Sequence, residues 1–444
     1  MQQRRPRSGL VAGKVSAPPL ITDAEFAAAM QDLGPFEPAP RLAAGVSGGA
    51  DSLALALLAD RWARHRGGSL LALIVDHGLR TESRHEAMLT RQRVARMGIP
   101  ARLLSIEGLA RGPALAERAR AARFAALEAA CKDAGILHLL LGHHAADQAE
   151  TLLMRSLSGS GPAGMAAMLP FVELTWLRML RPLLAFPPVR LRSTLTANGL
   201  GWIEDPSNRD IGATRPRLRL RRQDGDGTGS ATAALVHAAA ASGRRRAEQA
   251  ERLASGLSEH VVLRPEGFAL VTGRSMAPDL LTALIQTLSG AKYPPASRSV
   301  AELAASPRPA TLGGVRLLPA GRWGPGLLAV REAAAMAAPV PALPNAIWDG
   351  RFRLRADGKA YAGAVVGALG EAASRLRWAS PLPFVVLQSL PAVRFGSRIL
   401  AVPHLNFPDC QAHARWPLIF SPIRPATPSG VSIWGCINGG NTLC

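Results

Sequence analysis

The chain has 444 residues, too many for one ordinary hydrophobic core, so its length predicts two or three domains. Lysine and arginine number 52 against 32 aspartates and glutamates. The resulting net charge of +20 favours a polyanionic partner, with nucleic acid first and a membrane surface second. Only four of the cations are lysines, so a codon bias toward arginine accounts for the charge about as well.

Cysteine usage and apolar runs exclude several classes of protein. The four cysteines form no CxxC pair and no histidine/cysteine cluster has zinc-site spacing, which excludes a disulfide scaffold, a structural zinc and a cysteine-held iron–sulfur cluster. No apolar stretch reaches the roughly 18 residues of a membrane span, and the N-terminus has no apolar segment with a cleavage pattern. We therefore expect a cytoplasmic protein without membrane contact.

Predicted strands and helices alternate from residue 42 to residue 157. Alternation of this kind implies parallel strands joined by crossover helices, and continuous apolar strands indicate a sheet covered on both faces. The fold class predicted is α/β, a doubly wound parallel sheet whose ligands bind beyond the carboxyl ends of the strands. The elements, in chain order, are strand 42–46, helix 50–64, strand 70–76, helix 83–97, strand 102–107, helix 114–134, strand 138–143 and helix 147–157.

Composition divides the whole chain into further segments. Residues 1–40 are predicted to form a basic N-terminal arm and lead-in, and 41–215 the α/β domain. An Arg-rich and then Ala-rich stretch predicts a mainly helical domain over 216–332. A Pro/Ala-rich linker at 333–346 precedes a small C-terminal α+β unit, 347–444, which opens on the alternating pattern of a hairpin.

The connection between the first strand and the first helix has the composition of a phosphate site. Unpaired N–H groups and the dipole at a helix start favour an anion, and glycines remove side chains that would keep a phosphate away. Serines can donate hydroxyl hydrogen bonds, and an aspartate there suits a magnesium ion or a first-turn cap. A glycine turn that binds nothing is the alternative interpretation. The stretch is SGGADS: Ser47, Gly48, Gly49, Ala50, Asp51 and Ser52.

Other polar residues follow the later strands. Asp76 and His77 end the second strand, and His77 is interpreted equally well as a nucleotide contact or as a loop histidine. Arg120 and Arg123 are three apart on a helix, so both point to one face, which is either a phosphate clamp or a solvated arginine face.

The strand 138–143 ends at His143, and Asp147 and Glu150 begin the next helix on one of its faces. Carboxylates in a first helical turn are ordinary partners of the helix dipole, which is the alternative to a functional role.

Several of these stretches resemble a known family. SGGADS resembles the signature of the PP-loop ATP pyrophosphatases, which bind ATP on this loop. Further stretches, in family order, resemble one branch of that superfamily, the tRNA(Ile)-lysidine synthetases, and together they cover about residues 41–220. These stretches are VDHGLRTES (75–83), ARAARF (119–124), GHHAADQAETLLMRSLSGSG (142–161), RPLL (181–184) and WIEDPSNRD (202–210).

The resemblance implies a reaction. Family members join L-lysine to the wobble cytidine of an isoleucine tRNA with a CAU anticodon. ATP first adenylates the cytidine, releasing pyrophosphate, and the lysine amine then displaces AMP. The expected cofactors are ATP and Mg²⁺, and the expected partners are tRNA and L-lysine. The sequence leaves the oligomeric state open, with a homodimer as one candidate.

Roles carry over to matching positions only. The resemblance implies catalytic roles for Asp51, Arg120, Arg123 and Asp147, with magnesium on Asp51 and Asp147. It implies that the nucleotide contacts the SGGADS residues, Asp76, His77 and His143. Two positions depart from the family pattern: Ala146 replaces the first of two adjacent acids, and Phe124 replaces the usual tyrosine.

Downstream of the α/β core, two stretches are candidates for substrate contacts. Glu204, Asp205 and Asn208 lie in EDPSN, where a proline-nucleated turn is the favoured interpretation. Four alternate arginines would line one side of an extended segment and give a stripe for tRNA phosphates, which is why 216–332 is expected to contact tRNA. They are Arg215, Arg217, Arg219 and Arg221.

Two competing functions stay open at this point. A PP-loop tRNA thiolase generally needs paired cysteines, whereas the α/β domain has the single Cys131. A basic, non-catalytic RNA-binding protein that keeps a degenerate nucleotide fold is the second alternative, because Ala146 replaces a family acid.

Overall fold

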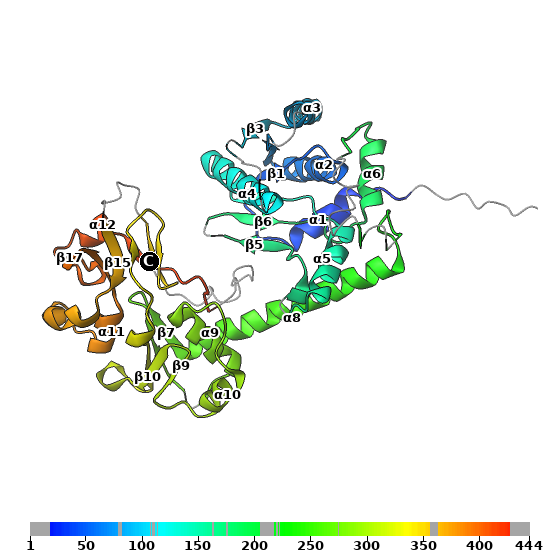
Figure 1. Ribbon diagram of the computed structural model, residues 1–444. Helices are drawn as coiled ribbons and strands as arrows, with labels where there is room; N and C mark the ends of the chain where they lie inside the picture. The colour runs from blue at the N-terminus through cyan, green and yellow to red at the C-terminus, as the bar shows by residue number, and fades with distance from the viewer. Residues whose placement is uncertain are drawn as a thin grey trace, which may run out of the picture. The chain divides into compact units, whose positions relative to one another are not determined.

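The structure divides the chain into two units, Met1–Arg246 and Ala247–Cys444, and the boundary lies within helix α8 (Ser230–His260) (Figure 1). It is a computed structural model. It describes residues 18–426 apart from 79–81, 107, 109–111, 113, 162–163, 175, 205–216, 219–220, 222, 274 and 356–362.

A six-stranded sheet organises the first unit, with strand order β3-β2-β1-β4-β6-β5. Neighbouring strands are parallel except for the edge pair β5 and β6. The strands are β1 Arg41–Gly45, β2 Ser69–Asp76, β3 Ala101–Ser105, β4 His138–Leu140, β5 Phe171–Glu173 and β6 Arg178–Leu180. The helices are α1 Asp23–Gln31, α2 Ala50–His65, α3 Ser83–Arg96, α4 Leu115–Ala134, α5 Ala145–Leu157 and α6 Pro188–Ala197.

The parallel α/β core predicted from the sequence is confirmed. All eight elements expected between residues 42 and 157 are present, although β4 is three residues long where a run of six was predicted. Periodicity did not predict α1, β5, β6 or α6. Strands β5 and β6 have only three residues each, which is too short for an alternating pattern to stand out.

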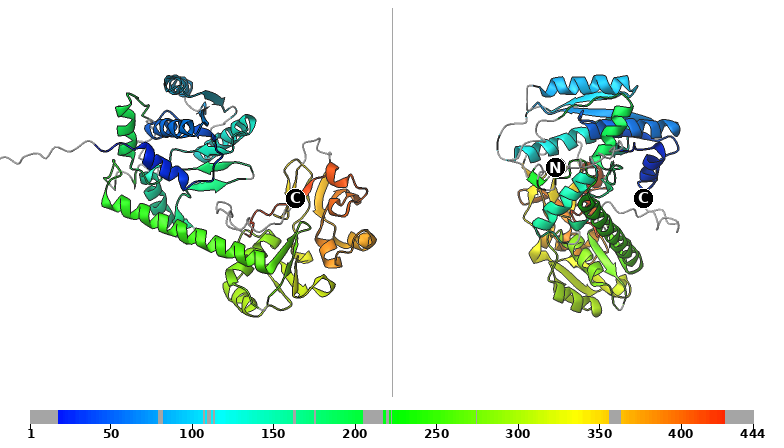
Figure 2. Two further views of the ribbon diagram at one scale, coloured as in Figure 1. Left: turned by 180° about the vertical axis from the view of Figure 1, so that it is seen from behind. Right: turned by 90° about the vertical axis from the view of Figure 1, so that its right-hand side faces the viewer.

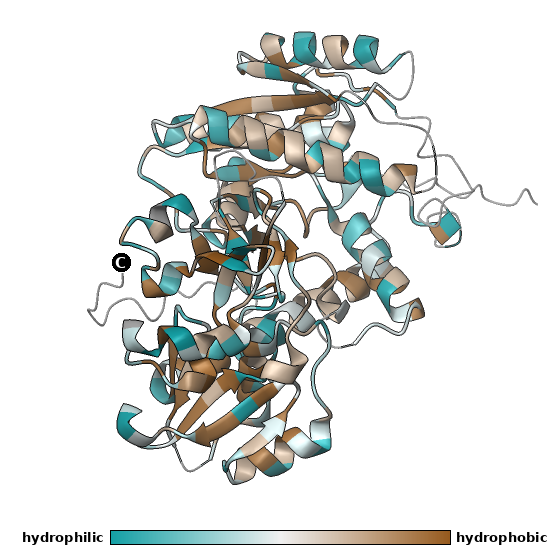
Figure 3. Cartoon of the chain, turned by 60° about the vertical axis from the view of Figure 1, so that its left-hand side comes forward, coloured by the Kyte–Doolittle hydropathy of each residue, from teal (hydrophilic) through white to brown (hydrophobic). Residues whose placement is uncertain are grey.

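Helices cover both faces of this sheet (Figure 2). Leu42 and Ala44 of β1 join the core formed with α1, α2 and α6, whereas Ala43, between them, joins the core under α4. Successive side chains of a strand point to opposite faces, so a strand covered on both sides has to be apolar throughout. The hydropathy colouring of Figure 3 shows this as hydrophobic strands among helices of mixed character.

The strand order reverses between β1 and β4, which makes this position the topological switch point of the sheet. The chain leaves β1 toward α2 and leaves β4 toward α5 at the same edge. Crevices outside the carboxyl ends of strands at such a point are where doubly wound folds bind ligands. The predicted phosphate loop and the GHH stretch therefore border one crevice.

The second unit is built on three antiparallel sheets, with orders β7-β8-β11-β10-β9, β12-β15-β16-β17 and β13-β14-β18. Its helices after α8 are α9 Pro278–Ser289, α10 Ser297–Ala305, α11 Phe384–Ser389 and α12 Ala412–Arg415. Its strands are β7 Val261–Arg264, β8 Phe268–Val271, β9 Ala310–Leu312, β10 Val315–Pro319, β11 Leu327–Arg331, β12 Val340–Pro341, β13 Ile347–Trp348, β14 Phe352–Leu354, β15 Ala364–Ala368, β16 Pro391–Phe395, β17 Arg398–Ala401 and β18 Leu418–Phe420.

The segment expected to be mainly helical, 216–332, contains α8, α9 and α10 and also the five strands β7 to β11. The expected linker, 333–346, includes β12, which pairs with β15. In the part of the chain that the structure describes, no helix is both long enough and apolar enough to cross a membrane.

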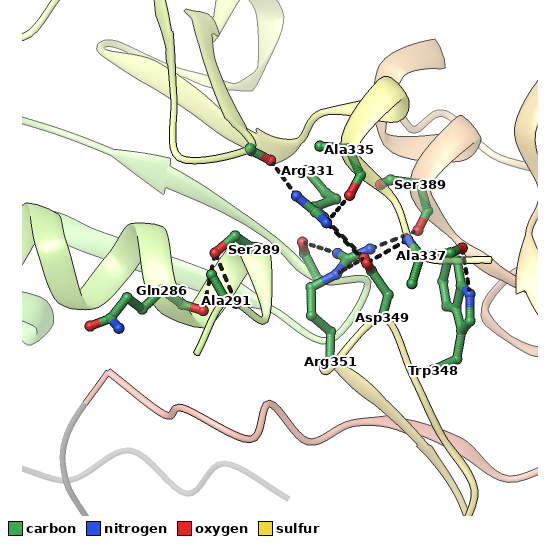
Figure 4. A network of polar contacts seen from close by, with 12 residues as sticks. Gln286, Ser289, Ala291, Arg331, Ala335, Ala337, Trp348, Asp349, Arg351 and Ser389 are labelled. Carbon is green, nitrogen blue, oxygen red and sulfur yellow. Dashed lines mark hydrogen bonds and ion pairs between the residues drawn. The ribbon is translucent and has the colours of Figure 1, made fainter. Parts of the chain in front are cut away.

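A buried ionic network ties elements of the second unit together (Figure 4). The Asp349 carboxylate accepts hydrogen bonds from Arg331 at 3.0 Å, from Arg351 at 2.7 Å and from the Ala337 N–H at 2.9 Å. The side chains of Asp349 and Arg351 are 2% and 0% exposed. One carboxylate thus compensates two buried guanidinium groups that come from β11 and from the β13–β14 turn.

We expect Asp349→Asn to lower the free energy of unfolding of this unit by ~3 kcal/mol or more, because the two arginines would stay buried without a counter-charge. Chemical denaturation followed by circular dichroism measures the change. Arg298→Ala, which removes an exposed pair with Glu302, is the control and should change stability by no more than ~0.5 kcal/mol. Equal effects of the two substitutions would contradict this account of the network.

Candidate functional site

The loop between β1 and α2 is held in shape by its own serines. The Ser47 N–H donates to the Ser52 hydroxyl at 3.1 Å, and the Ser52 hydroxyl donates to the Gly49 carbonyl at 3.0 Å. Gly49 is the N-cap of α2 and makes no side-chain cap hydrogen bond. The first-turn N–H groups of α2 therefore keep their capacity to bind an anion at the positive end of the helix dipole.

Two glycines permit close backbone packing around this loop. Gly48 has φ +88°, and a Cβ there would lie 2.2 Å from the Thr90 hydroxyl oxygen. Its carbonyl accepts a hydrogen bond from the Ile203 N–H at 2.9 Å. A Cβ on Gly142, which follows β4, would lie 3.2 Å from the carbonyl oxygen of Asp51. The missing side chains let the segment after β4 pack directly against the first turn of α2.

A cavity of about 300 Å³ opens at this edge of the sheet. It lies beside the loop and the start of α2, and residues from β2, α3, α4 and the segment after β4 complete its wall. Of the residues predicted from the sequence, those that line it are Ser47, Gly49, Asp51, Ser52, His77, Arg123 and His143. Glu86 of α3 also lines it, and no motif in the sequence had indicated this residue.

Asp51 and Asp147 meet at a histidine that the sequence analysis did not single out. The Nε2 atom of His144 lies 3.5 Å from the Asp51 carboxylate and 3.6 Å from the Asp147 carboxylate. His144 is the N-cap of α5, and its backbone N–H donates to Asp147 at 3.2 Å. The residue is buried, with 6% exposed. The pair of adjacent histidines in GHH was the available sign, but nothing in the sequence distinguished the roles of the two.

This donor set fits a magnesium ion that arrives with a nucleotide. Among the described residues, no group of three or more His, Cys, Asp or Glu side chains is arranged to hold a metal by itself. Magnesium is usually bound through one or two carboxylates together with substrate phosphates and water. Asp51 and Asp147 supply that number of carboxylates, whereas Ala146, where the family pattern has another acid, is a buried methyl group.

Asp76 is turned toward its own loop. Its carboxylate accepts hydrogen bonds from the Ser83 hydroxyl at 2.5 Å and from the Gly78 N–H at 3.0 Å. The bond from Ser83 is the main cause that holds the pKa of Asp76 below its ordinary value, with the Gly78 bond and the charges of His77 and Arg84 acting the same way. Asp76 thus shapes the loop after β2, and its neighbour His77 lines the cavity.

The two predicted arginines of α4 face different cavities. Arg123 lines the cavity beside the loop, whereas Arg120 lines a second one. Both guanidinium groups lie near the Phe124 ring, at 5.2 Å for Arg120 and 5.5 Å for Arg123. Of the two arginines predicted to clamp one ligand, Arg123 is therefore the one that lines the cavity beside the loop. Of the SGGADS residues, Gly48 and Ala50 are not among those that line the cavity.

Part of the predicted site falls in gaps of the structure. Asp205, Asn208, Arg215 and Arg219 lie outside the described residues. Glu204, Arg217 and Arg221 are described and are exposed.

Comparison with known proteins assigns the first unit to the class of PP-loop proteins. Residues 21–223 match the model of the PP-loop domain family. A tRNA(Ile)-lysidine synthase of Ruegeria pomeroyi is 34% identical over 384 residues, which cover 83% of this chain and 89% of that protein. The chain belongs to the tRNA(Ile)-lysidine synthase family.

Other likenesses are shorter. A tRNA(Ile)-lysidine synthase of a Bradyrhizobium species is 46% identical over 186 residues, or 41% of this chain. The chain matches about half of that relative's length, 52%. The match to the solved U34-tRNA thiolase of Methanococcus maripaludis covers 49% of this chain and 77% of that one, with 16% identity and a TM-score of 0.40.

Gly48→Ala should distort the loop, because alanine at φ +88° is strained and its Cβ would collide with Thr90. We expect a loss of ~1 kcal/mol or more in the free energy of unfolding, measured by thermal denaturation. Gly49→Ala is the matched control, since Gly49 is extended and a Cβ there meets its nearest atom at 3.7 Å. Equal destabilisation by both substitutions would contradict this view of the loop.

Ser83→Ala should raise the pKa of Asp76 toward its ordinary value. A carboxyl whose pKa is depressed by folding stabilises the fold when ionised, and this contribution is lost as the pH falls through its folded pKa. We expect the variant to be less stable than the wild type by ~1–2 kcal/mol at pH 7. The difference should shrink below about pH 4 in a pH series of thermal denaturation. Ser69→Ala, exposed at the start of β2, should show no such trend.

Proposed function

We propose that this protein joins L-lysine to the wobble cytidine of an isoleucine tRNA with a CAU anticodon, and converts ATP to AMP and pyrophosphate. The observation that carries the proposal is the cavity at the switch point, where the SGGADS loop, the start of α2 and Arg123 converge. Membership of the tRNA(Ile)-lysidine synthase family supports the choice of substrates. We place the reaction in the cytoplasm and keep a homodimer as a prediction.

In the proposed reaction the cytidine O2 attacks the α-phosphorus of ATP and pyrophosphate leaves. The lysine amine then attacks C2 of the adenylated base, and AMP leaves. The first-turn amides of α2 and the Ser47 hydroxyl would donate hydrogen bonds to the phosphate oxygens. Arg123 would add a cation that stabilises charge as it develops. The catalytic role inferred for Arg120 remains a prediction.

Asp51 and Asp147 are the proposed magnesium ligands. A magnesium ion bound there would offset negative charge on the departing pyrophosphate. His144 lies between the two carboxylates and would keep them near each other before the nucleotide binds. Because position 146 is alanine, the first turn of α5 offers the ion one carboxylate where the family pattern has two.

The single cysteine of the first unit does not favour sulfur transfer. Cys131 is buried on α4, and burial, assisted by the charge of Glu128, raises the pKa of its thiol to about 12. Thiol chemistry requires the thiolate, which would be scarce at neutral pH. No cysteine partner for it exists in that unit.

The experiment measures release of AMP and pyrophosphate with ATP, lysine and a CAU-anticodon transcript, adding and omitting each. Release should require both lysine and tRNA for sustained turnover. Asp51→Ala should lower turnover at least 100-fold while tRNA affinity stays within about threefold, because tRNA binding depends on many other phosphate contacts. Asp23→Ala, an exposed acid of α1, is the control and should retain turnover.

Two outcomes would contradict the proposal. Strong, salt-sensitive tRNA binding without any ATP turnover would indicate a non-catalytic RNA-binding protein. Turnover that proceeds equally well without lysine would indicate another PP-loop reaction.

A further inference from the structure

A second cavity, of about 180 Å³, lies between α4 and the strands β4 and β6. It shares no lining residue with the cavity beside the SGGADS loop. Most of its wall is apolar, and charged groups occur at three positions. The lining residues are Arg120, Phe124, Glu128, Leu139, Leu174, Leu177, Met179 and Arg181.

Arg181 is the unusual member of this wall. It follows β6 directly and is buried, with 9% exposed. Its Nη1 atom donates to the Leu169 carbonyl at 2.7 Å, but its buried Nε atom has no hydrogen-bond partner. A buried donor of a charged group without an acceptor is costly, so such a group is expected to meet an acceptor in some functional state.

Two arginines and one acidic residue are among the described residues that line the cavity. Burial and the nearby charge of Arg120 lower the pKa of Arg181 to about 10, which reflects the cost of holding two cations together here. Glu128 is the one acidic side chain among the described residues that line the cavity. Guanidinium groups bind carboxylates and phosphates in planar, paired hydrogen bonds, so an oxyanion in this cavity would meet two such groups.

We propose that this second cavity binds an oxyanion of a substrate, with Arg181 and Arg120 as its donors. Apolar walls at Phe124 and Met179 suit the aliphatic or sugar portion attached to that anion. The inference rests on the proposed function, which supplies two sources apart from ATP. One is the carboxylate of lysine and the other is a phosphate of the tRNA backbone.

The first arm of the test compares L-lysine with cadaverine, which has the same amine chain but no carboxylate. If the cavity holds the lysine carboxylate, the wild-type protein should show a KM at least tenfold higher for cadaverine. Arg181→Met should raise the KM for lysine at least tenfold and leave that for cadaverine unchanged. A structural defect would not discriminate between the two amines.

The second arm measures tRNA affinity as a function of salt. If the cavity holds an RNA phosphate, Arg181→Met should weaken tRNA binding at least threefold and reduce the slope of log affinity against log salt by about one. The KM values for lysine and cadaverine should then stay unchanged.

A second test variant, a control variant and a check of folding complete the experiment. Arg120→Met should reproduce the effect of Arg181→Met, and its exposed side chain makes a folding defect less of a concern. Arg102→Met removes an exposed arginine that pairs with Asp133 outside both cavities, and should change neither arm. Thermal denaturation verifies that each variant is folded.

Folded Arg181→Met and Arg120→Met proteins with unchanged amine discrimination and unchanged tRNA binding would overturn the proposal. Failure of the proposed function gives a different result, because the wild-type protein would then show no lysine-dependent release of AMP. The oxyanion site would in that case be judged by a selenate soak of crystals, where an anomalous peak beside Arg181 supports it and none rejects it.

Discussion

The first unit depends on the close approach of two main-chain segments at the switch point of its sheet. The residues after β4 pack on the first turn of α2 because Gly142 has no side chain, and the loop before α2 closes over Thr90 because Gly48 has none. This packing keeps the helix start at the edge of a cavity. A helix start so placed can offer N–H groups and a positive dipole end to an anion, which serine hydroxyls alone would not do as strongly.

Charged side chains also meet where these two main-chain segments approach each other. Two carboxylates, Asp51 and Asp147, come from different helices and share the imidazole of His144. Helix α4 presents Arg123 to the cavity beside the loop and Arg120 to a second cavity. The cavity beside the loop is thus lined by both acidic and cationic side chains, a combination that suits a phosphate chain with a metal ion and cationic contacts.

The second unit is held together in a different way. Its sheets are small and antiparallel, and a buried carboxylate with two buried arginines connects β11 to the β13–β14 turn. Buried ion pairs of this kind add little net stability relative to apolar packing. Removing one partner is nevertheless costly, because the other charge then stays buried without compensation. The network therefore fixes which turn packs against which strand. The pattern of apolar residues alone would assign its charged side chains to the surface.

Local patterns determined much of this molecule. Apolar runs and helical spacing were sufficient to predict eight elements, because the residues that each element buries form a pattern within its own sequence. These elements are β1, α2, β2, α3, β3, α4, β4 and α5. The same patterns placed Ser47, Asp51 and His143 at one edge of a parallel sheet. Only the tertiary structure decided that His144 joins Asp51 to Asp147, that Arg120 and Arg123 face different cavities, and that Asp349 lies between two arginines. These are contacts between side chains distant in sequence or turned by a fraction of a helix, and their geometry is fixed by packing of whole elements, which no local spacing encodes.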